Sequence, residues 1–71
     1  MKIEWEYTDL YFGRKVQVGP EEYIIGYIPE NNDQTPVLIE LFPNTGKVCR
    51  FKDGKAGALN WLNHRQAIPV V

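Results

Sequence analysis

The sequence predicts an α+β fold, an antiparallel meander of four to five strands with one C-terminal helix packed on one face of the sheet. Three observations support this fold class. Short runs with the two-residue period of β-strands fill the chain before Asp53. Turn-forming residues separate these runs at roughly hairpin spacing. Apolar residues recur at helical spacing only after Asp53. The chain has 71 residues, so we expect a single domain over 1–71.

Three strands are expected in the N-terminal half. Residues 3–7 alternate between apolar and charged side chains, which predicts a half-buried antiparallel strand. Residues 14–18 form a second short run, and Gly19-Pro20 turns the chain after it. Residues 23–28 are rich in Ile and Tyr, which favours a third strand. Within this run, Gly26 indicates a bulge or the close approach of another side chain.

A hairpin is expected in the middle of the chain. Residues 29–36 lack apolar side chains other than proline, so we expect an exposed and mobile loop there. Residues 37–42 and 47–52 are the predicted strands. Between them, Pro43-Asn44-Thr45-Gly46 predicts a tight turn in which Gly46 takes a positive φ.

The helix is expected after this hairpin. Residues 55–63 have helical spacing, and Asp53 is a candidate N-cap. Asn63 or His64 is expected to end the helix in a left-handed cap. Residues 68–71 form an apolar tail. Since Pro69 cannot donate a hydrogen bond within a sheet, the tail should be an edge strand or a docked extension.

One helix can cover only one face of the sheet, but the middle strands are apolar on both faces. Glu4, Glu6 and Glu40 indicate that their face is the exposed one. This assignment places an apolar patch outside, with an arginine beside it. Exposed apolar patches usually mark interaction sites, so we predict a protein interface. Its members are Tyr23, Tyr27, Leu38, Phe42 and Arg50.

Two arrangements would hide this patch within one chain. The sheet could curl into a small, partly open β-barrel with a C-terminal helix. Alternatively, the apolar tail and residues 10–12 could fold over the patch. The sequence leaves both alternatives open.

The charge is unevenly distributed along the chain. Residues 1–40 have a net charge of −5, whereas residues 41–71 have a net charge of +4. This asymmetry indicates either internal pairing of acidic and basic strands or an anionic partner. Arg50, Lys52 and Lys55 precede a predicted helix N-terminus, so they are candidate ligands for a nucleotide or single-stranded nucleic acid. The net charge of −1 weakens this alternative.

Catalytic chemistry has little support in the sequence. The chain contains one histidine, His64, and one cysteine, Cys49, so neither a disulfide within the chain nor a cysteine-rich metal site can form. No phosphate-binding glycine motif is present. We therefore expect no enzyme activity, no cofactor and no metal. The lone cysteine and the charged N-terminus, without a membrane-spanning run, indicate a cytoplasmic protein.

The interpretation that follows is a small cytoplasmic non-enzymatic protein-binding module, such as an inhibitor, an adaptor or an immunity-like accessory factor. Its simplest form is a homodimer through the open face of the sheet. The alternative is an anion-binding module that uses Arg50, Lys52 and Lys55. The sequence does not identify the partner protein.

Overall fold

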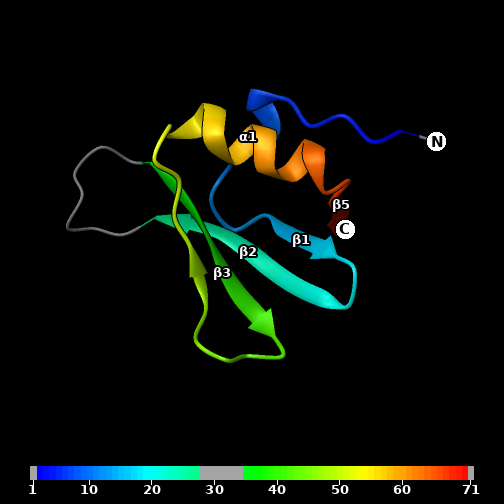
Figure 1. The fold of residues 1–71 in the computed structure, drawn as a ribbon, viewed down its shortest axis with the longest axis vertical. Helices are drawn as coiled ribbons and strands as arrows, with labels where there is room; N and C mark the ends of the chain where they lie inside the picture. The colour runs from blue at the N-terminus through cyan, green and yellow to red at the C-terminus, as the bar shows by residue number, and fades with distance from the viewer. Residues whose placement is uncertain (1, 28–34, 71) are drawn as a thin grey trace.

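The computed structural model describes residues 2–27 and 35–70, which form a five-stranded antiparallel sheet with one helix on one side (Figure 1). The order of the strands is β4-β3-β2-β1-β5, so β4 and β5 are the two edges and the sheet does not close. The predicted fold class is confirmed, and the barrel alternative is wrong. The elements are η1 (Tyr7–Asp9), β1 (Lys15–Val18), β2 (Glu21–Tyr27), β3 (Pro36–Phe42), β4 (Val48–Cys49), α1 (Lys55–His64) and β5 (Ile68–Val70).

Glycines shape the turn between β1 and β2 and the packing of β2 against β3. Val18 pairs with Glu21, so β1 and β2 are joined by a two-residue turn in which Gly19 has a φ of 57°. Glycine is the residue best suited to this positive φ. In β2, a Cβ atom on Gly26 would lie 2.9 Å from Cδ1 of Ile39 on the neighbouring strand. The predicted close approach at Gly26 is therefore confirmed.

The β3–β4 hairpin contains the predicted turn and a bulge. Gly46 has a φ of 87°, as its place in the turn predicted. The register between β2 and β3 shifts, since Tyr23 pairs with Glu40 while the preceding Glu22 pairs with Phe42. Leu41 is the additional residue of this bulge. The return strand is shorter than predicted, because only Val48–Cys49 pairs with β3.

The hydrophobic core lies between α1 and one side of the sheet, which we call the covered face. The helix contributes Ala58 and Leu62 to it. Gly57 lets the segment before the helix lie close, since a Cβ atom there would be 3.3 Å from Cβ of Phe51. Each large side chain buried here contributes about 1.5–3 kcal/mol. The core residues are Trp5, Leu10, Val16, Tyr23, Ile25, Leu38, Ala58, Leu62 and Ala67.

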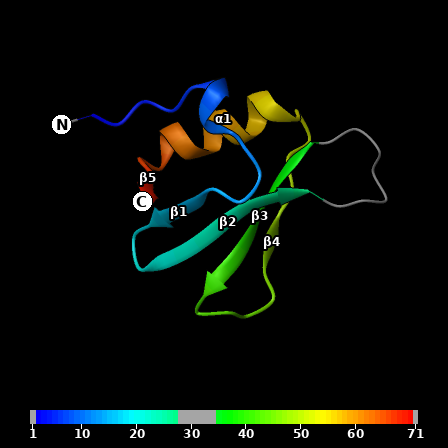
Figure 2. The same ribbon diagram turned by 180° about the vertical axis from the view of Figure 1, so that it is seen from behind.

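The N-terminal segment, residues 2–6, is not the predicted strand. It runs alongside α1 (Figures 1 and 2), and its backbone bonds to two side-chain amides rather than to another strand. Asn63 accepts from the Trp5 amide at 2.5 Å and donates to the Trp5 carbonyl at 3.2 Å. Gln66 makes the equivalent pair with Ile3, at 2.9 and 3.0 Å. The alternating pattern therefore predicted correctly that Trp5 is buried and that Glu4 and Glu6 are exposed, but the predicted strand is wrong.

Both ends of α1 differ from the expected caps. Gly54 occupies the N-cap position, and no side chain caps the helix there, so the prediction for Asp53 is wrong. The left-handed residue after the helix is Gln66, with a φ of 51°, instead of Asn63 or His64. This geometry directs the chain into β5, where Pro69 pairs with Val16 of β1. The predicted edge strand is confirmed.

Most of the loop expected over residues 29–36 lies outside the described residues. Of the expected loop, Thr35 and Pro36 are described, and Pro36 is the buried first residue of β3. Within the described part of the chain, no helix is long and apolar enough to cross a membrane.

Candidate functional site

The side of the sheet that faces away from α1 is largely aliphatic, and we call it the open face. The strand register places Ile24, Ile39 and Val48 side by side across three strands. Its exposed apolar side chains range from 37% exposed at Ile39 to 60% at Phe42. Exposed apolar area of this kind is typical of interaction surfaces. The open face consists of Lys15, Gln17, Glu22, Ile24, Ile39, Phe42, Val48, Ile68 and Val70.

The two faces of the sheet are the reverse of those expected from the sequence. Tyr23 and Leu38, which were expected outside, are fully buried under α1. Glu40, which was taken to mark the exposed face, is also buried on the covered face. Its Oε1 accepts hydrogen bonds from the Thr45 backbone at 2.6 Å and from the Thr45 hydroxyl at 2.5 Å. Because these bonds replace water, a carboxylate can lie on the buried side of the strand.

The five residues of the predicted interface do not form one surface. Tyr23 and Leu38 belong to the core. Tyr27 is exposed but lies on the covered-face side, where its ring packs against Phe12 at 4.8 Å between centroids. Phe42 belongs to the open face, and Arg50 follows β4 at the rim of a hollow. Only Phe42 therefore joins the apolar surface that the structure shows.

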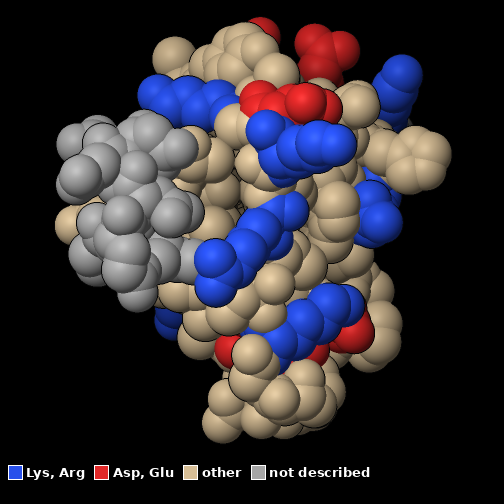
Figure 3. All heavy atoms as spheres, turned by 60° about the vertical axis from the view of Figure 1, so that its left-hand side comes forward, with Lys and Arg blue, Asp and Glu red and all other residues tan. Residues whose placement is uncertain are grey.

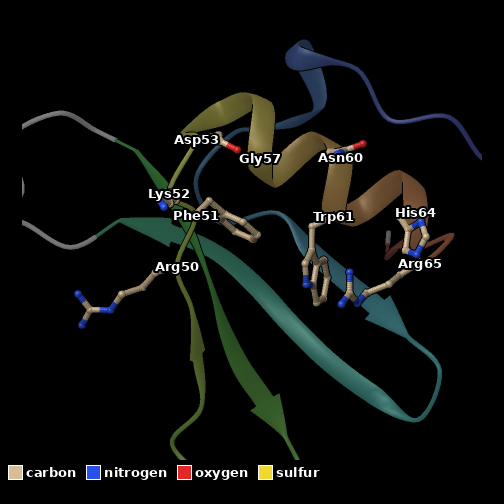
Figure 4. A pocket seen from close by; sticks show the side chains of 9 residues that line it. All are labelled: Arg50, Phe51, Lys52, Asp53, Gly57, Asn60, Trp61, His64 and Arg65. Carbon is tan, nitrogen blue, oxygen red and sulfur yellow. The ribbon is translucent and has the colours of Figure 1, made fainter.

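A shallow hollow of about 350 Å³ lies between residues 50–53 and α1 (Figure 4). Arg50 and Lys52 line it from the segment after β4. His64 and Arg65 line it from the end of the helix. The other lining residues are Phe51, Asp53, Gly57, Asn60 and Trp61.

Trp61 is the centre of an aromatic and cationic stack in the hollow. Its ring meets Tyr23 edge-on at 5.8 Å and Phe51 edge-on at 6.2 Å between centroids. The guanidinium carbon of Arg65 lies 4.4 Å from the centre of the Trp61 ring. Contacts of this geometry are attractive because the ring face is electronegative. The rings of Tyr23 and Phe51 therefore fix Trp61 on the side of the core, and Trp61 contacts Arg65 on the side of the solvent.

The basic residues of the C-terminal half do not pair internally within the described part of the chain. There, neither Arg50, Lys52, Lys55 nor Arg65 forms an ion pair with a carboxylate. Internal pairing by neighbouring strands, the first explanation for the charge asymmetry, is therefore not found for these four. Figure 3 shows several Lys and Arg side chains gathered on one face of the molecule.

Two members of the predicted anion-binding set, Arg50 and Lys52, line the hollow. Lys55 is exposed at the start of α1 and does not line it. Sequence reasoning missed His64 and Arg65. The four-residue spacing of Trp61 and Arg65 at the C-terminal end of the helix was the signal that could have indicated their contact.

A tyrosine–lysine pair lies on the covered face beside Cys49. The Tyr23 hydroxyl donates to Oε1 of Glu21 at 2.7 Å, and burial, followed by this bond, raises the pKa of Tyr23. The Lys47 ammonium lies 5.9 Å from the centre of the Tyr23 ring. The hydrogen bond with Tyr23, followed by the charges of Tyr23 and Glu21, raises the pKa of Lys47.

Cys49 is a poor candidate for a nucleophile at neutral pH. The side chain is half-buried, and this burial raises the pKa of its thiol, although Lys47 and Arg65 act in the opposite direction. Since the thiolate is the reactive form, a raised pKa lowers reactivity. Within residues 2–27 and 35–70, no three His, Cys, Asp or Glu side chains are grouped so that they could hold a metal ion.

Comparisons with protein-family models, with curated protein sequences and with solved structures find no match to this chain.

Proposed function

We propose that this chain is a small, non-enzymatic protein-binding module of the cytoplasm that uses its open face, and that the partner on this face is a second copy of the chain. The observation that carries the proposal is the aliphatic row Ile24–Ile39–Val48, in which Ile24 is half-buried and Ile39 and Val48 are exposed. Exposed Ile68 and Val70 extend this surface at the other edge. Removal of such side chains from water is the main favourable term in protein association.

The charges on the open face favour a copy of the same chain. Lys15 lies opposite Ile24, and Glu22 lies two residues along the same strand as Ile24. These are the two charged side chains among the members of the face, so the face is neutral. In a two-fold interface the same patch meets itself. A two-fold axis between Lys15 and Glu22 would therefore place each base near the acid of the other copy.

The edges of the sheet are less suited to association than its face. β4 pairs over two residues only, and β5 has Pro69 at its centre. Short edges and proline are features that block the addition of a further strand. Sheet-on-sheet packing avoids this obstacle, because it joins side chains and not backbone groups.

The oligomeric state tests this proposal. Sedimentation velocity over a dilution series should give twice the 8.2 kDa of the single chain at high concentration. The double variant I39Q/V48Q should remain a monomer at the same concentrations, because two central contacts become polar. The matched control is Y7Q, which alters an exposed aromatic residue in η1, outside the sheet. It should dimerise like the unmodified chain.

Circular dichroism of each variant shows whether the fold is retained. If the unmodified chain remains a monomer throughout the series, the proposal is wrong. It is also wrong if a folded I39Q/V48Q variant dimerises as strongly as Y7Q.

A further inference from the structure

We propose that the hollow beside Trp61 binds one nucleotide of a single-stranded nucleic acid, with the Arg65–Trp61 stack facing the base and the cations after β4 facing the phosphates. This site lies on the helix side of the sheet, and it does not depend on association through the open face.

The cations of the hollow are available to an anion. Arg50, Lys52 and Arg65 line it, and in the described part of the chain no carboxylate pairs with them. Asp53 is the acidic residue among the lining side chains, so the three cations outnumber it. Phosphate groups bind such side chains through charge-assisted hydrogen bonds. The local charge therefore favours a phosphate ligand although the whole chain carries −1.

The walls of the hollow also suit a flat ring. Trp61 and Arg65 extend from α1 toward the sheet, and Phe51 points toward Trp61 from the opposite wall (Figure 4). The Arg65 guanidinium rests on the indole at 4.4 Å, so its outer side offers a planar surface. Bases of single-stranded RNA stack on aromatic rings and on guanidinium planes. Asn60, which also lines the hollow, supplies both a donor and an acceptor for a base edge.

The direction of Arg50 favours a strand over a free mononucleotide. Its side chain lies at the edge of the hollow and points away from Trp61 (Figure 4). A mononucleotide seated against Trp61 would leave this guanidinium without a phosphate. In a strand, the next phosphate along the backbone can meet it. Cations that follow a backbone beside a stacking ring are typical of single-strand binding proteins.

Fluorescence anisotropy with a short labelled oligothymidylate at low salt tests the site. We expect R65Q and R50Q each to weaken binding by about tenfold, and each to lower the salt slope by about 0.7, as for one lost phosphate contact. The control is K2Q, which removes the same charge from exposed Lys2, outside both the hollow and the open face. It should retain the affinity of the unmodified chain.

A second set of ligands separates the base from the phosphates. An abasic strand of equal length should bind about tenfold more weakly, because it has no base to stack. Thymidine monophosphate should compete only at much higher concentration than the strand.

The proposal is overturned by any of four results: no binding at low salt, equal loss in K2Q and R65Q, equal affinity for the abasic strand, or equally strong competition by the mononucleotide. Because the glutamine variants alter exposed side chains, circular dichroism should show an unchanged fold.

Discussion

Glu40 shows how one hydrogen-bonding partner can reverse the expected position of a side chain. The hydroxyl of Thr45, then its backbone amide, then the charge of Lys47 hold the pKa of Glu40 below its ordinary value, against the opposing effect of burial. A carboxyl whose pKa is lower in the folded state stabilises the fold above its unfolded-state pKa. That contribution is lost as the pH falls through the folded-state pKa.

This relation predicts the effect of T45V. Valine keeps the backbone donor to Glu40 but removes the hydroxyl donor, so the pKa of Glu40 should rise toward its ordinary value. Acid unfolding should then begin at a higher pH than in the unmodified chain. Carboxyl-carbon NMR titration measures the pKa directly. The control T8V changes an exposed threonine in η1 and should leave it unaltered. An unchanged Glu40 pKa in T45V would contradict the assignment of the cause.

At the scale of residues, the sequence predicted the role of glycines in the backbone better than it predicted which side chains are buried. Gly26 and Gly46 were assigned correctly. A glycine within a strand indicates a close approach, and a glycine at the end of a tight turn indicates a positive φ, so both features could be predicted from the local sequence. Tyr23 and Glu40 were assigned to the wrong face. Their burial depends on partners in other elements, Trp61 for the ring and Thr45 for the carboxylate, which periodicity does not reveal.

At the scale of elements, the backbone of the N-terminal segment is hydrogen-bonded as in a β-strand, but its partners are side-chain amides. Asn63 and Gln66 each present a carbonyl and an amide group to the backbone of one residue, as a neighbouring strand would. The Trp5 indole adds a buried bond of 2.7 Å to the Ala67 carbonyl. The sequence predicted strands and helix over most of their lengths from periodicity. It could not predict this attachment, because both amides lie about sixty residues from the backbone that they bind.

Hydrogen exchange should show this attachment. The amides of Ile3 and Trp5 should exchange slowly, and the Glu4 amide between them, for which no such bond is found, should exchange fast. N63A should remove the protection of Trp5 and lower the free energy of unfolding by about 1–2 kcal/mol for its two lost bonds. N60A is the control, since exposed Asn60 lies one turn earlier in α1. Uniform exchange at residues 3–5 would show that the segment is not held in this way.

At the scale of the whole molecule, the sheet separates two different surfaces. The open face is aliphatic and neutral, whereas the rim of the helix side carries cations that pair with no carboxylate among residues 2–27 and 35–70. The sequence indicated both properties, as too much apolar surface for one helix and as a charge asymmetry. It misplaced the apolar surface because the face of a two-sided strand can be assigned only when its partners are known.

The separation predicts that the two proposed activities are independent. I39Q/V48Q should dissociate the dimer yet bind oligothymidylate with unchanged affinity per chain, because both substitutions are neutral and lie on the open face. R65Q should bind oligothymidylate about tenfold more weakly and keep the dimer mass. Titrating each variant by anisotropy and by sedimentation checks both statements. A loss of both activities in either variant would show that the surfaces are coupled.

The hydrogen bonds that attach residues 2–6 to the side-chain amides of Asn63 and Gln66 have a consequence for synthesis on the ribosome. Ile3 and Trp5 are synthesised before the side chains of Asn63 and Gln66 that bind them, and about sixty residues lie between the partners. Long-range contacts cannot form until both partners are available. The hairpin of β1 and β2 can pair as soon as its own residues are made, whereas Trp5 stays exposed to water until the end of α1 has been translated.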